Sequence, residues 1–190
     1  MAPKIRITRE MILQAAFEII RKNGYESLNA RSVAECLNCS TQPILYHFKT
    51  MAEIRDAVYE EADKFHTLTI MNGMEGADDP FLGIGLAYIR FGRDEKNLFR
   101  FLFQTNHYDG VSLADLINSP DLAPLLDLAR SELECDPEEV KEKFLIFVSA
   151  VHGYASLLAN NALEYDEDQA VRTLEMIFDA MKGRRDEKTL

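Results

Sequence analysis

Apolar residues recur along most of this chain at steps of three and four, the spacing of one face of an α-helix. The first such stretch follows Thr8, a residue type that caps helix N-termini well. It ends at Asn23-Gly24, where a glycine suits the left-handed position just past a helix. No segment alternates apolar and polar residues as a half-buried strand does. The pattern therefore predicts an all-α protein.

The same spacing predicts further helices along the rest of the chain. They cover about residues 30–37, 41–47, 51–68, 80–93, 95–105, 113–118, 121–133, 137–163 and 168–181. Pro43, Pro80 and Pro137 fall in the first turns of their helices, where a missing N–H costs little. Asn72-Gly73 and Asp78-Asp79-Pro80 mark a loop after the fourth helix, so we expect a domain boundary inside or after that helix.

The second and third predicted helices are short, and only Asn38-Cys39-Ser40 separates them. Two short helices with such a turn form the helix-turn-helix unit, whose second helix enters the major groove of DNA. We therefore expect residues 1–50 to form a three-helix DNA-binding domain of the helix-turn-helix type. The fourth helix, about 51–68, would connect it to a second helical domain over residues 69–190.

The net charge of the whole chain argues against DNA binding, but the distribution of that charge along the chain argues for it. The chain has 190 residues with a net charge of −11, and a polyanion such as DNA should repel it. Residues 1–50, however, contain seven Lys and Arg against four Glu, or +3. The remaining 140 residues contain 14 basic and 28 acidic groups, or −14. Opposite signs in the two parts suggest two separate tasks on one chain.

Composition excludes several other classes of protein. No stretch approaches the roughly 20 apolar residues of a membrane span, and no apolar core follows Met1–Arg6 as in a secretory signal. Three cysteines, an odd count, indicate a reducing cytoplasm. We find no phosphate loop, nucleophile elbow or plausible pair of catalytic carboxylates, so we expect no enzyme and no cofactor.

Cys36 and Cys39 have CxxC spacing, which could mean a thiol switch or half of a zinc site. The chain has no second pair, and its histidines and Cys135 complete no ligand set at metal spacing, so we expect no metal. The helical pattern places both thiols at buried positions. We therefore interpret them as structural cysteines and leave a redox role open.

The third predicted helix carries side chains that suit DNA recognition. Thr41 and Gln42, at its start, are polar groups able to reach base edges or phosphates, and glutamine can pair with adenine through two hydrogen bonds. Tyr46, His47 and Lys49 follow at its end and could hold the DNA backbone. The alternative for Tyr46 and His47 is that they pack on the first helix.

On these residues the sequence resembles the tetracycline-repressor (TetR) family of transcriptional regulators. The resemblance covers about residues 5–65, and its motifs are Asn23-Gly24-Tyr25, Arg31-Ser-Val-Ala34, Cys39-Ser40, Tyr46-His-Phe-Lys49 and Glu53-Ile54. Ser40-Thr-Gln-Pro-Ile44 is similar to the recognition helix of one subgroup. The resemblance implies a homodimer on a palindromic, double-stranded DNA operator and a small-molecule effector that releases it. The DNA-binding residues would be Arg31, Ser40, Thr41, Gln42, Pro43, Tyr46, His47 and Lys49.

Two positions depart from the wider family. Leu45 lies where many members carry an aromatic residue, often tyrosine, so the backbone contact usually assigned there would fall to Tyr46. Met51 replaces a frequent lysine at the start of the fourth helix, which removes one expected phosphate partner. Binding would then depend on Lys49, on an arm carrying Lys4 and Arg6, and on N–H groups of the fourth helix.

The C-terminal part carries the candidates for effector binding and dimerisation. Its segments Phe99–Phe103 and His152–Leu157 are similar to the same subgroup, and we take Phe99, Phe103, His152 and Tyr154 as ligand-binding candidates. The alternative is that these aromatic residues form simple core. The last two long helices would pair with those of a second copy in a four-helix bundle. Its contact residues would be Val148, Val151, Ala155 and Leu158.

We conclude from the sequence that this is a cytoplasmic, ligand-responsive and homodimeric repressor. Two alternatives remain open. One is a regulator of the same fold controlled by a protein partner, and the other is a helical interaction module that does not bind DNA.

Overall fold

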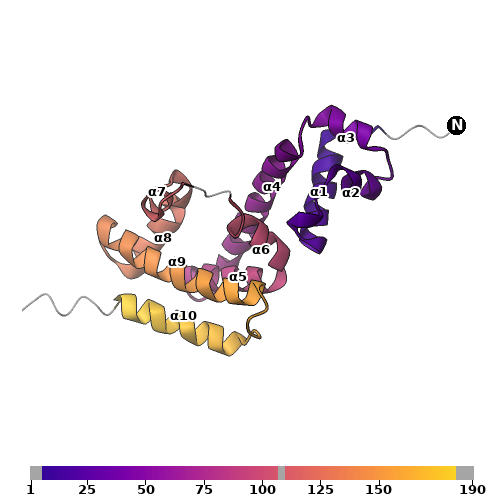
Figure 1. Cartoon of the computed structure of the whole chain (residues 1–190). Helices are drawn as coiled ribbons and strands as arrows, with labels where there is room; N and C mark the ends of the chain where they lie inside the picture. The colour runs from indigo at the N-terminus through magenta and orange to yellow at the C-terminus, as the bar shows by residue number, and fades with distance from the viewer. Residues whose placement is uncertain (1–5, 107–109, 183–190) are drawn as a thin grey trace, which may run out of the picture. The chain divides into compact units, whose positions relative to one another are not determined.

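The computed structural model of the chain describes residues 6–106 and 110–182, and these contain helices and connecting loops without strands. This confirms the all-α prediction. The α-helices are α1 (Arg9–Asn23), α2 (Ala30–Cys36), α3 (Thr41–His47), α4 (Met51–Met71), α5 (Pro80–Asp94), α6 (Lys96–Phe103), α7 (Leu113–Ile117), α8 (Ala123–Leu133), α9 (Pro137–Ala159) and α10 (Glu167–Lys182) (Figure 1). Short 3-10 helices cover Tyr25–Ser27, Asn72–Met74 and Pro120–Leu122. Within the described ranges, no helix is both long enough and apolar enough to cross a bilayer.

The helices form two compact units. The N-terminal unit comprises the chain up to Thr67 together with Glu95–His107, and the C-terminal unit comprises Leu68–Asp94 together with the chain from Tyr108. Helix α6 therefore lies in the N-terminal unit, where it packs on α1, although its place in the sequence is after α5. The domain boundary that the sequence predicts separates two functions, DNA binding and the tasks of the second domain. It stays a prediction.

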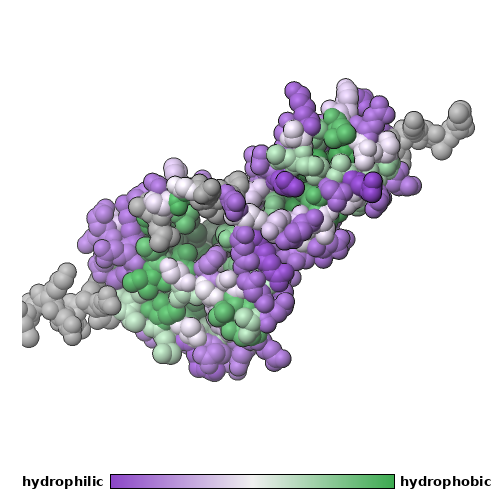
Figure 2. All heavy atoms as spheres, viewed as in Figure 1, coloured by the Kyte–Doolittle hydropathy of each residue, from purple (hydrophilic) through white to green (hydrophobic). Residues whose placement is uncertain are grey.

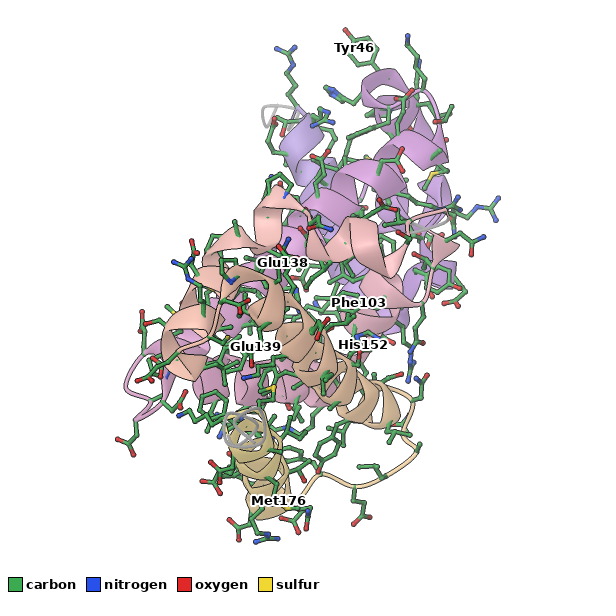
Figure 3. All side chains as sticks on the ribbon, turned by 90° about the vertical axis from the view of Figure 1, so that its left-hand side faces the viewer. Tyr46, Phe103, Glu138, Glu139, His152 and Met176 are labelled. Atoms are coloured by element: carbon green, nitrogen blue, oxygen red, sulfur yellow. The ribbon has the colours of Figure 1, made fainter. Side chains whose placement is uncertain are left out.

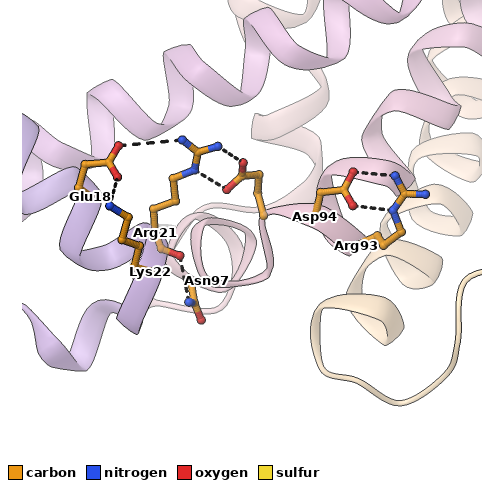
Figure 4. A network of polar contacts seen from close by, with 7 residues as sticks. Glu18, Arg21, Lys22, Arg93, Asp94 and Asn97 are labelled. Carbon is orange, nitrogen blue, oxygen red and sulfur yellow. Dashed lines mark hydrogen bonds and ion pairs between the residues drawn. The ribbon is translucent and has the colours of Figure 1, made fainter.

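In the N-terminal unit, polar contacts hold the end of α1 against α6. The Arg21 guanidinium forms a two-point ion pair with Glu95, and the Asn97 amide donates to the Arg21 carbonyl at 3.0 Å (Figure 4). Gly24 follows with a φ of +87° and a ψ of 160°, a conformation that is essentially restricted to glycine. The chain thus turns where the sequence predicts, but by this extended conformation rather than the left-handed helical one.

In the C-terminal unit, aromatic residues of α5, α9 and α10 meet in one core. The Phe81 ring lies 4.4 Å from that of Phe147 and 5.6 Å from that of Phe178, measured between ring centroids. Helix α5 packs closely on α9 at Gly92, where a Cβ atom would lie only 2.7 Å from the Ala155 carbonyl oxygen. This core fixes which face of α9 points inward.

Helix α9 ends at Ala159, earlier than the expected end near residue 163. Asn160 is its C-cap, and Asn161 has a φ of +56°, which a continuing helix does not allow. Apolar residues continue to Leu163, so the periodicity alone extends beyond the true end. Asparagine tolerates positive φ better than most residues, which explains the stop.

Candidate nucleic-acid interface

Local sequence determines the start of α2. The Asn29 side chain accepts hydrogen bonds from the backbone N–H groups of Arg31 and Ser32, each at 3.0 Å, and the Ser32 hydroxyl accepts from the Asn29 N–H at 3.0 Å. This reciprocal arrangement is a capping box, which satisfies N–H groups that a helix start leaves unpaired. The cap leaves the Arg31 side chain exposed on the first turn.

The turn between α2 and α3 is also specified by its residues. Asn38 has a φ of +50°, and the Cys39 N–H bonds back to the Ala34 carbonyl at 2.9 Å. A residue of positive φ followed by this backward hydrogen bond is the Schellman motif, a common C-terminal cap of α-helices. Ser40 then takes the extended conformation of an N-cap, and its hydroxyl makes no capping bond. The exposed Ser40 side chain therefore remains available for other contacts.

Helix α3 has one buried face and one exposed face. Ile44 and Phe48 are buried, with 0% and 2% of their surface exposed. The opposite side, which we name the outer face of α3, consists of Thr41, Gln42, Leu45, Tyr46 and Lys49, all exposed. Tyr46 is 81% exposed and points away from the protein (Figure 3). Pro43 is half-buried at the edge of this face.

His47 contacts the chain before α1 instead of pointing outward. Its Nε2 donates to the Ile7 carbonyl at 3.0 Å, and the Tyr46 ring lies edge-on to the imidazole with centroids 5.3 Å apart. The Arg9 guanidinium lies 4.7 Å from the centre of the Phe48 ring and so joins α1 to the end of α3. His47 is thus a positioning residue that ties the N-terminal segment to α3. Of the two residues of the expected N-terminal arm, Lys4 and Arg6, Lys4 lies outside the described residues.

The start of α4 is capped by its own side chains. Glu53 accepts from the Lys49 N–H at 2.9 Å, and its own N–H donates to the Thr50 hydroxyl at 3.2 Å. The Glu53 N–H, one of the α4 groups expected to hold phosphate, therefore already has an acceptor. The Glu53 carboxylate also places negative charge at this helix start, which makes it a poorer site for an anion.

The two cysteines near the turn are not buried as the sequence analysis expects. Cys36 is exposed and Cys39 is half-exposed. Cys36 faces a groove that Glu18, Lys22 and Glu35 also line, while the N–H of Cys39 is held in the helix end described above. The short helix α2 has only one buried face, formed by Val33 and Ala34, and this explains the exposure of Cys36.

The four ligand-binding candidates lie in different units. Phe99 and Phe103 belong to α6 of the N-terminal unit, where their ring centroids lie 4.9 Å apart and the His66 ring lies 5.2 Å from Phe103. His152 and Tyr154 belong to α9 of the C-terminal unit. Phe99 is fully buried, which agrees with the core alternative for that residue.

His152 makes a defined polar contact inside the C-terminal unit. The Tyr88 hydroxyl and Nδ1 of the His152 imidazole are hydrogen-bonded at 2.8 Å. Partial burial of the ring lowers the pKa of His152, because the charged form loses hydration. The folded protein therefore favours neutral His152.

Burial of the His152 ring predicts a pH-dependent contribution to stability. Since folding lowers the pKa of His152, its contribution is complete above the unfolded pKa of about 6.5 and is lost as the pH falls through the folded pKa. We expect the free energy of unfolding, measured by urea titration from pH 7.5 to 5, to fall less steeply in His152→Gln than in the wild type. Tyr88→Phe removes the hydrogen bond but keeps the ring buried, so it should retain the wild-type slope. Equal slopes for wild type and His152→Gln would contradict this assignment.

The dimer candidates on α9 face the interior of their own protomer. Val151, Ala155 and Leu158 are 4%, 0% and 2% exposed, and Val148 packs beside the same core. Val151, Ala155 and Leu158 are therefore covered within their own protomer, while Val148 is half-buried. The outward stripe of α9, which we name the α9 outer stripe, consists instead of Ile146, Ala150, Gly153 and Leu157. Figure 2 shows hydrophobic residues exposed over α9.

Within the described ranges, no group of three or more His, Cys, Asp or Glu side chains is arranged to hold a metal ion.

Comparisons with known proteins agree with this geometry. A family profile described as "Tetracyclin repressor-like, C-terminal domain" matches residues 81–181. The fold is similar to that of multidrug binding protein EbrR, solved in complex with imidazole, at 18% identity over 89% of this chain and 88% of that one, with a TM-score of 0.54. It is also similar to a TetR-family member from Streptomyces coelicolor A3, at 19% identity over 89% of this chain and 96% of that one, with a TM-score of 0.53. None of the curated proteins compared with the chain matches it.

Proposed function

The chain belongs to the tetracycline-repressor-like family of DNA-binding transcriptional regulators, and from that premise we propose that it is a homodimeric repressor which a small molecule releases from a palindromic operator. Members of this family are regulators and not enzymes, in line with the prediction from sequence. We also assign it to the subgroup with Ser40–Ile44 as the start of the recognition helix, acting on DNA in the cytoplasm.

The outer face of α3 is the observation that carries this proposal. Thr41 and Gln42 stand at the start of the helix and Lys49 just past its end, with all three side chains exposed. An exposed helix face that begins with base-reading groups and ends with a cation suits insertion into the major groove. Arg31 on α2 adds a second exposed cation for the DNA backbone.

A dimer provides a second recognition helix, which can bind the second half of the operator. A two-fold dimer presents two recognition helices about 34–36 Å apart, one helical turn of DNA. The α9 outer stripe, with Ile146 52% and Leu157 46% exposed, is the surface that we assign to this contact. On α10, Met176 is 71% exposed and provides a further apolar group.

The family and one similar structure support a small-molecule effector. Multidrug binding protein EbrR was solved with imidazole, which supports a small-molecule site in a protein of this fold. A ligand that prefers the released conformation shifts the population away from the DNA-binding one. A coupling free energy of about 1–3 kcal/mol is typical of such regulation.

Two substitutions on the outer face of α3 test the proposal, because their effects should differ in kind. Gln42→Ala is expected to cost about 1–3 kcal/mol of binding free energy on specific DNA and little on random DNA, since it removes a base contact. Lys49→Ala should weaken binding to both DNAs alike and make the salt dependence shallower, since it removes a phosphate contact. Gel-shift titrations on selected and random duplexes from about 50 to 200 mM salt measure both quantities.

A matched control is Lys64→Ala on α4, an exposed lysine that pairs with Glu61 at 3.1 Å and lies outside the outer face of α3. It should leave both affinities unchanged. Absence of any specific binding by the wild type at about 50 mM salt, where electrostatic attraction is strongest, would refute the repressor proposal.

A further inference from the structure

The middle of the outer face of α3 is apolar. Leu45 is 53% exposed, although Ile44 beside it is completely buried. Leu45 follows Thr41 by four residues, so the two side chains lie on one face of α3, and Lys49 follows two residues past the end of the helix. Thr41 and Leu45 lie about one turn, or 5.4 Å, apart along the helix. An apolar side chain thus stands between a polar group and a cation on a surface that is otherwise polar.

We propose that Leu45 determines operator specificity by packing against thymine 5-methyl groups in the major groove. This inference rests on the proposed function of α3 as the recognition helix. Leucine has no hydrogen-bonding group, and the major-groove edges of adenine, guanine and cytosine present donors and acceptors. Thymine alone presents a methyl group there. If Leu45 packed over one of these polar base edges, the hydrogen-bond donors or acceptors of that edge would be left unpaired.

The neighbouring residues separate this task from contact with the DNA backbone. The Tyr46 ring is held edge-on by His47, and His47 is itself bonded to the Ile7 carbonyl. Tyr46 is thereby fixed beside Leu45 with a hydroxyl able to donate to phosphate. Lys49 provides a cation just past the end of α3. Leu45 is the member of this group without a polar end, so its contribution must come from apolar contact.

The charge around Leu45 favours DNA over an apolar protein surface as its occupant. The first 50 residues carry a net charge of +3, and Arg31 and Lys49 are exposed on α2 and at the end of α3. A leucine on a basic surface is complementary to the major groove, which combines flanking phosphates with thymine methyl groups. A protein partner that docks on Leu45 would not respond to a single methyl group on DNA, and the test below uses this difference.

The experiment removes only the methyl group. Duplexes that the full-length protein enriches from a randomised library are resynthesised with deoxyuridine in place of each thymidine in turn. We expect one half-site position at which loss of the methyl weakens wild-type binding about four-fold, from burial worth about 0.8 kcal/mol per carbon. Substitution in both half-sites should weaken it about 15-fold, because the two losses multiply. Leu45→Ala should bind the thymidine and deoxyuridine duplexes equally.

Two controls keep the test specific. Leu45→Met keeps an apolar side chain of similar size and should retain the response to the methyl group. Leu116→Ala changes an exposed leucine of α7 and should behave as the wild type does. If Leu45→Ala keeps the full response, or if the wild type is indifferent to every methyl group, the inference is wrong while the repressor proposal stands. If no duplex is enriched at all, the proposed function itself fails and this inference fails with it.

Discussion

Lysines at both Ile146 and Leu157 are expected to convert the dimer into monomers and to lower operator affinity by about 100-fold or more. Both residues lie on the α9 outer stripe, 11 residues or three helical turns apart, and are half-exposed in the protomer. Two such stripes related by a two-fold axis would bury four ammonium groups in an apolar contact. Uncompensated buried charges of this kind are strongly destabilising. Losing the second half-site also removes the gain from bivalent binding, which is commonly 10²–10⁴-fold.

Analytical ultracentrifugation gives the subunit mass, and gel-shift titration on a selected duplex gives the affinity. The matched control is the pair Val111→Lys and Leu116→Lys, which adds the same charge at two exposed apolar residues outside α9 and α10. It should remain dimeric. A double lysine variant of the α9 outer stripe that stays dimeric, with an unchanged helical circular dichroism spectrum, would place the dimer contact elsewhere.

Gly92→Ala is expected to lower the free energy of unfolding by about 2–3 kcal/mol, the cost of overpacking a well-packed core. A Cβ at Gly92 would lie 2.7 Å from the Ala155 carbonyl oxygen and 2.8 Å from its Cβ atom. Neither atom belongs to a flexible side chain, so α5 and α9 would have to separate. Since the Phe81 and Phe147 rings pack across the same pair of helices, the separation would loosen their contact as well. For a chain of this length the loss corresponds to a fall in Tm of about 4–12 °C.

Gly153→Ala is the matched control within a helix. A Cβ at Gly153 meets nothing within 4 Å in the protomer, and alanine favours a helix over glycine by about 0.5–1 kcal/mol. We therefore expect slight stabilisation. Because Gly153 belongs to the α9 outer stripe, both glycine variants are best compared in the double lysine background, where contacts between copies do not contribute. Equal Tm values for Gly92→Ala and its parent would show that α5 and α9 can separate at little cost.

For helix α9, the apolar periodicity predicts the helix itself but not which of its faces is buried. The sequence predicts this helix and its start at Asp136-Pro137 correctly, because an aspartate N-cap followed by proline is a local signal. It predicts an apolar stripe through Val151, Ala155 and Leu158 as well, but α9 has two apolar stripes. Choosing the stripe that faces the core requires knowing where the Phe81 and Phe178 rings lie, and they come from α5 and α10. No pattern within α9 contains that information.

The same distinction applies to the DNA-reading helix. The bounds of α3, its exposed polar residues Thr41 and Gln42, and its basic end follow from local sequence. The exposure of Leu45 follows once Ile44 and Phe48 are known to be buried, because their burial determines which face of α3 points inward. The contact between His47 and the Ile7 carbonyl joins residues 40 positions apart. It exists only because the segment before α1 lies beside the end of α3.

Local patterns in the sequence predict the helical class, the helix-turn-helix unit and the division of charge between a basic N-terminal part and an acidic remainder. These properties depend on spacing, capping and turn residues, which act within a few positions along the chain. Only the tertiary structure decided that α6 packs on α1, that Cys36 is exposed, and that the outer stripe rather than the inner one of α9 is available to a second copy. The physical reason is that burial is a property of neighbours in space. A side chain is inside or outside according to which distant helix covers it.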